Sequence, residues 1–163
     1  MDLNSKSTTE LIQAYSDIIA ELKHRGVLRT KNVLGELGEH LVIDYYNNTP
    51  GLPKLQLALT GTENVDTTSR QWERYSIKSI SRNVTGVFHG LNPPDSRGNQ
   101  NQLFEHVIIA KFNDTYQLEM IIELGWAAFL EHKKWHKRMK AYNLVLSKKL
   151  LNDAKVVLKR SLN

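Results

Sequence analysis

The sequence predicts a single-domain protein of the α/β (α+β) class, with a central mixed β-sheet of about four strands flanked by helices. Helix-type apolar periodicity occurs at both ends of the chain, in residues 7–47 and again after residue 126. Between these segments lie two pairs of strand-type runs, and a polar turn joins each pair. The length of 163 residues suits one domain with its own hydrophobic core.

Residues 7–23 are predicted to form the first helix. Ser7 and Glu10 have the spacing of a capping box, and Gly26 is placed to end the helix. Five apolar residues repeat at helical spacing, and we expect this stripe to pack on the core: Leu11, Tyr15, Ile18, Ile19 and Leu22.

Residues 30–47 are predicted to form a second helix. Gly35 and Gly38 each cost about 1 kcal/mol relative to alanine inside a helix, so they indicate close approach by another part of the chain or by a ligand. Glu36 and Glu39 lie three residues apart, hence side by side on the helix surface, and alone they would be ordinary solvated acids. The expected buried stripe consists of Leu34, Leu37, Leu41 and Tyr45.

Two β-hairpins are predicted in the middle of the chain. The first pairs residues 64–68 with residues 73–81, and the second pairs residues 103–112 with residues 117–124. Residues 86–101 form a long polar loop between them. Loops of this length usually carry function or are disordered.

The first hairpin places an acid and a lysine close together. Because side chains alternate along a strand, Ser76 and Lys78 share one face, and Tyr75 and Ile77 share the other. A lysine within an apolar strand is costly to bury unless it is paired. We therefore expect Asp66 and Lys78 to lie on neighbouring strands and to point the same way.

The C-terminal part, residues 126–163, is predicted to be a basic helical segment with helices at 126–139 and 147–158. Residues 131–163 carry ten lysines and arginines against two acidic residues, whereas the chain before them has a net charge of −3. This asymmetry favours a polyanionic partner, although a lysine-rich solvated helix face would have the same composition. The expected phosphate contacts are Lys133, Lys134, Lys137, Arg138 and Lys140.

Other residue patterns exclude several classes of site. The chain has no cysteine, so disulfides and thiolate metal sites are excluded. It has no apolar signal core and no run of 18 apolar residues, so we expect a cytoplasmic protein without a membrane span. His132 and His136 are spaced as helical metal ligands can be, but without a third ligand they indicate a basic helix face. Trp72 falls at a hairpin tip where glycine or asparagine is usual, and its role is open.

Three separate pieces of the chain resemble the PD-(D/E)XK nuclease superfamily, the restriction-endonuclease-like fold. They are GELGE at residues 35–39, VDTTS at 65–69 and YSIKS at 75–79, with the basic EHKKWHKRM at 131–139 behind them. In that superfamily a helix supplies a glutamate, a strand supplies an aspartate and the next strand supplies an acid-X-lysine. More narrowly, the chain resembles small uncharacterised bacterial restriction-endonuclease-like proteins over about residues 28–150.

The resemblance implies a metal-dependent endodeoxyribonuclease that hydrolyses phosphodiester bonds in double-stranded DNA. Asp66 would be a metal ligand, and Glu39, or alternatively Glu36, would be the helix carboxylate at the metal. Lys78 would position the attacking water and stabilise the charge that develops on the phosphate. Mg²⁺ suits these oxygen ligands, and Mn²⁺ is expected to substitute for it. A homodimer is implied, because two copies can cut both strands.

Ser76 stands where this superfamily has the acid of its acid-X-lysine. Glu73 is five positions from Lys78 and falls on the opposite strand face unless a bulge intervenes. Glu36, Glu39 or Glu123 would otherwise supply the missing charge. The serine also favours an alternative, a catalytically weak or inactive module that binds DNA or a protein partner. A third hypothesis is an interaction protein whose basic segment binds an acidic partner.

Overall fold

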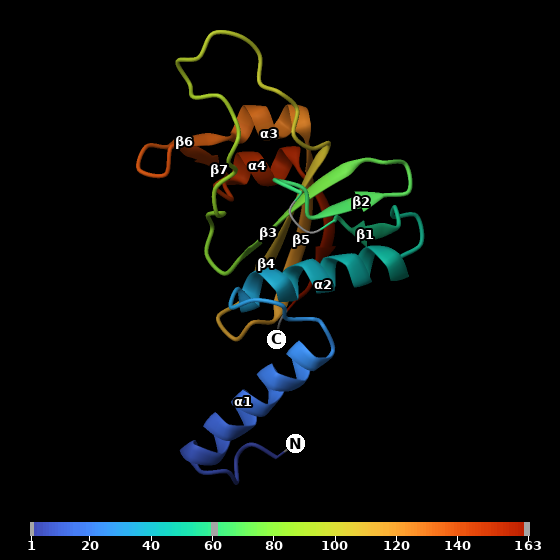
Figure 1. The fold of residues 1–163 in the computed structure, drawn as a ribbon, viewed down its shortest axis with the longest axis vertical. Coiled ribbons are helices and arrows are strands. Elements are labelled where there is room, and N and C mark those ends of the chain that lie inside the picture. The colour runs from blue at the N-terminus through green and yellow to red at the C-terminus, as the bar shows by residue number, and fades with distance from the viewer. Residues whose placement is uncertain (1, 60–61, 162–163) are drawn as a thin grey trace.

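The computed structural model describes residues 2–59 and 62–161, and within them the chain forms four helices and eight strands (Figure 1). In chain order these are α1 (Thr8–His24), α2 (Val33–Asn48), β1 (Leu55–Leu57), β2 (Thr67–Ser69), β3 (Arg74–Ile80), β4 (His106–Phe112), β5 (Leu118–Gly125), α3 (Trp126–His132), β6 (Lys134–His136), β7 (Ala141–Asn143), α4 (Lys148–Asp153) and β8 (Lys155–Lys159).

The central sheet has six strands in the order β1-β2-β3-β4-β5-β8, so the expected number of about four was too low. Both predicted hairpins are confirmed as antiparallel pairs, β2 with β3 and β4 with β5. β3 and β4 run parallel at the centre of the sheet, while the remaining neighbours are antiparallel. The long loop is the crossover that this parallel pair requires. The class is therefore mixed α and β, as predicted.

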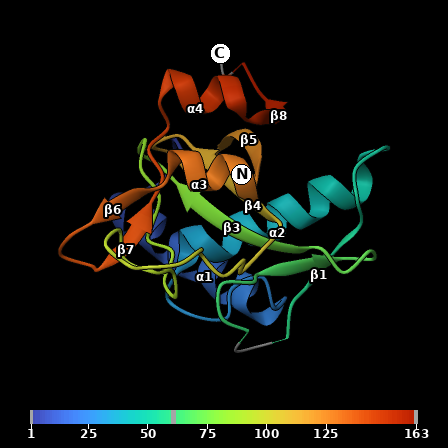
Figure 2. The ribbon, with the colours of Figure 1, turned by 90° about the horizontal axis from the view of Figure 1, so that it is seen from above.

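Helices cover the two faces of this sheet, and each face has its own apolar cluster (Figure 2). α2 packs on the face that carries Tyr75 and Ile77 of β3. On the other face, Ile80 packs with Phe88 of the long loop and with residues of α3, α4 and the two-stranded β6–β7 sheet. The alternation predicted for β3 thus sends Tyr75 and Ile77 to one cluster and Ile80 to the other.

Gly38 lets α2 approach β3 closely. A Cβ atom built at this glycine would lie 1.8 Å from Ser79 Oγ and 2.9 Å from Ser79 Cβ. The close approach predicted from the helical glycines is therefore confirmed at this position. The most deeply buried apolar residues of α2 are Val42 and Tyr46. Each follows directly after a member of the predicted stripe, Leu41 or Tyr45, and the stripe itself is only half-buried.

α1 has the predicted ends but not the predicted packing. Ser7 and Glu10 form the capping box, and Gly26 adopts a left-handed φ of 72° just beyond the helix. Yet no residue of α1 is buried, and the helix projects away from the sheet (Figure 1). Its apolar stripe stays in contact with solvent, with Tyr15 62% and Ile18 47% exposed. The expectation that this helix supports the core was wrong.

The C-terminal segment is less helical than predicted. α3 ends at His132, and the extended Lys133 leads into β6. Only the first half of the range 126–139 is therefore helical, where a helix was expected throughout. The expected helix at 147–158 ends at Asp153, after which β8 pairs with β5 at the edge of the sheet. Val156 and Val157 are β-branched residues, which favour an edge strand over a further helical turn.

Candidate functional site

Asp66 lies at the point where β2 and β3 begin to separate. Its backbone amide donates to Tyr75 O at 2.9 Å, next to the Thr67–Tyr75 pair of the ladder. Its carboxylate Oδ2 accepts hydrogen bonds from Ile77 N at 2.6 Å and from Ser76 Oγ at 3.4 Å. The side chain thus takes the place of the next ladder hydrogen bond and is held in one orientation.

Burial raises the pKa of Asp66 above its ordinary value, against the opposing effects of the Ile77 amide and the Lys78 ammonium. Burial therefore disfavours the charged form of this carboxylate, and a further cation nearby would stabilise it. Ser76 itself is buried and 1% exposed, so its hydroxyl faces Asp66 rather than solvent.

Lys78 is half-buried beside Asp66, over an aromatic ring. Its Nζ lies 4.8 Å from the centroid of the Phe88 ring, which gives it a cation–π contact. Within the part of the chain that the structure describes, no carboxylate lies within 4.0 Å of this ammonium. Burial lowers its pKa, while the charges of Asp66 and Glu39 oppose that shift. The lysine keeps its hydrogens free for a ligand.

Glu39 and Glu36 of α2 have different roles. Glu36 Oε2 accepts hydrogen bonds from the amides of Arg29 at 2.7 Å and Thr30 at 3.0 Å, so this carboxylate fixes the chain segment before the helix. Glu39 makes one ion pair, with Arg29 Nη2 at 3.0 Å. Burial raises the pKa of Glu39, and the negative charge of Asp66 raises it further. Glu39 is therefore the helix carboxylate that is coupled to Asp66.

Glu39 and Asp66 line one cavity of about 310 Å³, which we call the Glu39–Asp66 cavity. Arg29, Thr30 and Val65 also contribute to its walls. Lys78 does not line this cavity, and its ammonium lies over the Phe88 ring. The structure thus places Glu39 and Asp66 on one cavity and Lys78 within electrostatic range of both carboxylates.

The donor set of this cavity fits a hard divalent cation. Two carboxylates line this space, and the pKa of each is raised because burial disfavours its charged form. A cation between them would stabilise both charged forms. Mg²⁺ needs only one or two protein carboxylates, because it retains several of its waters. Arg29 supplies part of the positive charge at present and would have to share Glu39 with the metal.

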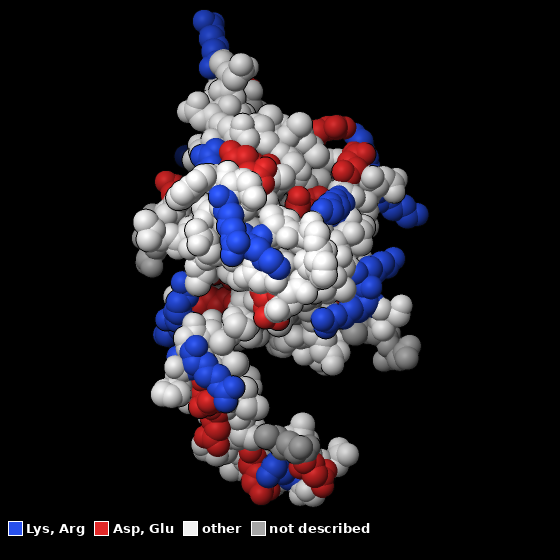
Figure 3. Space-filling model, turned by 90° about the vertical axis from the view of Figure 1, so that its right-hand side faces the viewer, with Lys and Arg blue, Asp and Glu red and all other residues white. Residues whose placement is uncertain are grey.

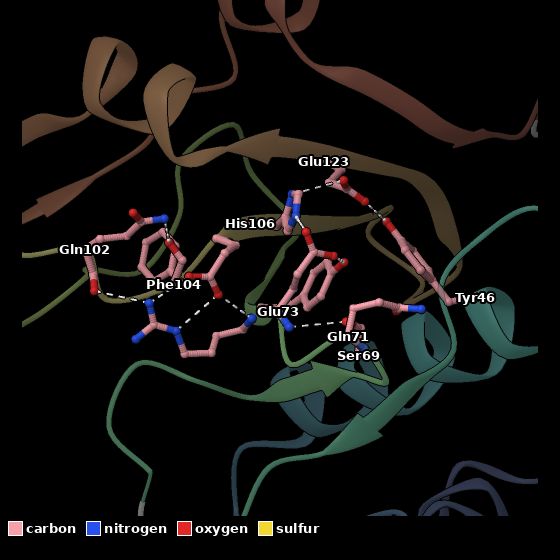
Figure 4. A network of polar contacts seen from close by, with 11 residues as sticks. Tyr46, Ser69, Gln71, Glu73, Gln102, Phe104, His106 and Glu123 are labelled. Carbon is pink, nitrogen blue, oxygen red and sulfur yellow. Dashed lines mark hydrogen bonds and ion pairs between the residues drawn. The ribbon is translucent and has the colours of Figure 1, made fainter.

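Glu73 and Glu123 do not fill the position that Ser76 leaves without an acid. Both belong to a network on the Tyr75 face of the sheet, opposite Lys78 (Figure 4). His106 lies between them, with Nε2 3.4 Å from Glu73 and Nδ1 3.3 Å from Glu123. Strand alternation predicted this side for Glu73, and no bulge in β3 changes it.

Two tyrosines complete the network. Tyr46 OH donates to Glu123 at 2.6 Å, and Tyr75 OH donates to Glu73 at 3.1 Å while its ring stacks on His106 (Figure 4). The neighbouring Glu123 carboxylate raises the pKa of His106 although burial opposes it. Burial also disfavours the Glu123 anion, but the contacts from His106 and Tyr46 lower its pKa on balance. Sequence reasoning missed His106, because a single histidine at the start of an apolar strand has no distinguishing pattern.

The predicted phosphate contacts lie on and beside the β6–β7 hairpin rather than on a helix. Lys133 precedes β6, Lys134 lies in it, and Lys137, Arg138 and Lys140 follow in the turn. The long loop joins this hairpin to the candidate site, because Phe88 N donates to Tyr142 O at 2.7 Å and the Phe88 ring lies under Lys78. On the opposite side of the molecule, acidic and basic side chains are interspersed (Figure 3).

The two histidines of the basic segment are separated by the end of α3. His132 Nε2 lies 2.7 Å from Asp153 Oδ2, and together with Glu131 they form a group whose ligand atoms lie within 4.8 Å of one another. Lys149 already pairs with Glu131 at 2.8 Å, so the contacts of this group join α3 to α4. His136 instead accepts a hydrogen bond from Met139 N.

No protein-family model matches the chain, and no curated protein is significantly similar to it. Among the described residues, no helix has the length and apolar character needed to cross a lipid bilayer.

Proposed function

We propose that the protein is a metal-dependent endonuclease of the restriction-endonuclease-like type, which hydrolyses phosphodiester bonds in double-stranded DNA. The observation that carries this proposal is the arrangement around Asp66, with Glu39 across a shared cavity and a free, half-buried ammonium on Lys78. The basic hairpin next to the long loop supports a polyanionic substrate.

Each side chain has a distinct task in this chemistry. Glu39 and Asp66 would hold Mg²⁺, or Mn²⁺ in its place, which would supply Lewis acidity toward the phosphate and a bound water of lowered pKa. Ser76 and the Ile77 amide hold the Asp66 carboxylate in position. Lys78 stabilises the negative charge that develops on the phosphate oxygens as water attacks and the bridging oxygen leaves.

Cleavage of supercoiled plasmid in Mg²⁺ tests the assignment. Lys78→Ala is expected to reduce the rate by about 100-fold or more, because it removes a charge that acts in the transition state. Lys159→Ala is the matched control, since it removes an exposed strand lysine of β8 and should leave the rate unchanged. Plasmid cleavage by Lys78→Ala at the wild-type rate would refute the role of this lysine.

Metal binding is tested separately by calorimetric titration with Mg²⁺ and Mn²⁺. The wild type is expected to bind one ion that Asp66→Asn loses, because the amide removes one of two charged ligands. Binding that is unchanged in Asp66→Asn would show that the ion is held elsewhere.

A second candidate function, a non-catalytic DNA-binding module, is favoured by Ser76. Its hydroxyl is directed at Asp66, so the second strand acid is replaced by a hydrogen-bond donor. Duplex DNA binding without cleavage in either metal would support this candidate over the nuclease.

A further inference from the structure

A second cavity, of about 400 Å³, lies between the long loop and the β6–β7 hairpin, and we call it the loop cavity. Its walls include Pro93, Pro94 and Gln100 from the loop, and Lys133, Trp135 and Tyr142 from the hairpin side. None of these residues lines the Glu39–Asp66 cavity. The volume is in the range of sites that hold small molecules.

Hydrogen bonds hold the loop side of this cavity in place. Asn92 N donates to Gln100 Oε1 at 2.6 Å, and Gln100 Nε2 donates back to Asn92 O at 2.7 Å. Tyr142 OH donates to the same Asn92 carbonyl at 3.0 Å, which ties the loop to β7. The walls are therefore preorganised, and a ligand would not need to order the loop first.

The hairpin side combines aromatic rings with an unneutralised charge. The Trp135 and Tyr142 rings meet edge to face, with centroids 4.9 Å apart. Lys133 Nζ lies 4.3 Å from the Tyr142 ring centroid and, over residues 2–59 and 62–161, within 4.0 Å of no carboxylate. Aromatic surface for a base beside an ammonium for a phosphate is the combination that proteins use to hold a single-stranded nucleotide.

We propose that the loop cavity binds one unstacked nucleotide of a DNA strand, with its base against Trp135 and its phosphate at Lys133. Tyr142 is only 4% exposed and supports the Trp135 ring from behind. This proposal rests on the proposed function for its substrate, DNA, and adds how one strand is held. Tyr142 pairs through its backbone with Phe88, whose ring underlies Lys78. The contacts through Tyr142 and Phe88 therefore connect the bound nucleotide to the part of β3 that carries Lys78.

Fluorescence anisotropy at constant salt and without divalent metal tests the proposal. Two labelled DNA duplexes are compared, one fully paired and one with a single bulged nucleotide. The wild type is expected to bind the bulged duplex about tenfold more tightly, from the stacking of one base. Trp135→Leu should abolish this preference. Lys133→Gln should reduce it, whereas Lys159→Gln, which removes the same charge from an exposed residue of β8 outside the cavity, should not.

Equal wild-type affinity for the two duplexes, or a preference that survives both Trp135→Leu and Lys133→Gln, would overturn the loop cavity as a nucleotide site. Either result would leave the nuclease proposal standing, because that is decided by Mg²⁺-dependent cleavage of paired DNA and its loss in Lys78→Ala. Failure to bind either duplex would likewise overturn the loop cavity as a nucleotide site, and the cleavage assay would still decide the nuclease proposal. Trp135 packs against the core, so thermal melting checks its variant, and Lys133→Gln gives an independent result if Trp135→Leu does not fold.

Discussion

Replacement of Gly38 by alanine tests the contact that places α2 on the sheet. In an unconstrained helix this change would stabilise the fold by about 1 kcal/mol. Here the new Cβ would lie 1.8 Å from Ser79 Oγ and 2.9 Å from Ser79 Cβ. Rotation of the serine side chain relieves the first contact but not the second, because Cβ is fixed to the backbone of β3. Overpacking of this kind costs about 1–3 kcal/mol, so we expect a net loss of about 1 kcal/mol.

A double-mutant cycle with Ser79→Gly isolates this effect. Without the serine side chain, the nearest atom to the alanine Cβ is Phe112 Cε2 at 3.5 Å, an ordinary contact. Gly38→Ala should therefore destabilise the wild type and stabilise the Ser79→Gly protein, a reversal of sign in the free energy of unfolding measured with urea. Gly86→Ala, at an open position with no neighbour within 4 Å, is the steric control.

The reasoning is refuted if Gly38→Ala raises stability equally in both backgrounds, because α2 would then not lie against Ser79. The result also bears on function, since Glu39 is the next residue of the helix. A displaced α2 should weaken metal binding at the Glu39–Asp66 cavity.

Two further predictions concern pH and backbone strain. The neighbouring Glu123 carboxylate raises the folded-state pKa of His106. The stabilisation that His106 contributes is therefore complete below its ordinary pKa of 6.5 and is lost as the pH rises through the folded-state pKa. The pKa of Glu123 is lowered in the folded state. The stabilisation that Glu123 contributes is therefore present above its ordinary pKa of 4.5 and is lost as the pH falls through the folded-state pKa. His106→Gln should therefore cost most, about 1–2 kcal/mol, between these values, and an equal cost at pH 5.5 and pH 8.5 in urea unfolding would contradict this. Trp72 is 81% exposed and has a left-handed φ of 65°, so Trp72→Gly should raise the melting temperature by about 2–4 °C, whereas a lower value would show that the indole packs on the fold.

The candidate site could be predicted in part because its pieces are local. Strand alternation places Ser76 and Lys78 on one face whatever surrounds them, and a short hairpin brings the Asp66 carboxylate to the Ser76 hydroxyl. The coupling of Glu39 to Asp66 was expected only from the resemblance, since the two residues are 27 positions apart in the chain. The distinct role of Glu36 depends on the amides of residues 29 and 30, which no periodicity shows.

The sequence by itself determined the elements whose cause lies within a few residues: the Ser7 cap, the two hairpins and the apolar centre of the sheet. Tertiary structure alone decided which surfaces are covered. It left the stripe of α1 in solvent, packed α2 through Gly38 against Ser79 of β3, made residues 155–159 an edge strand and placed His106 between Glu73 and Glu123. The physical reason is that dihedral preferences and side-chain alternation act along the chain, whereas burial and ion pairing depend on residues that only the folded chain brings together.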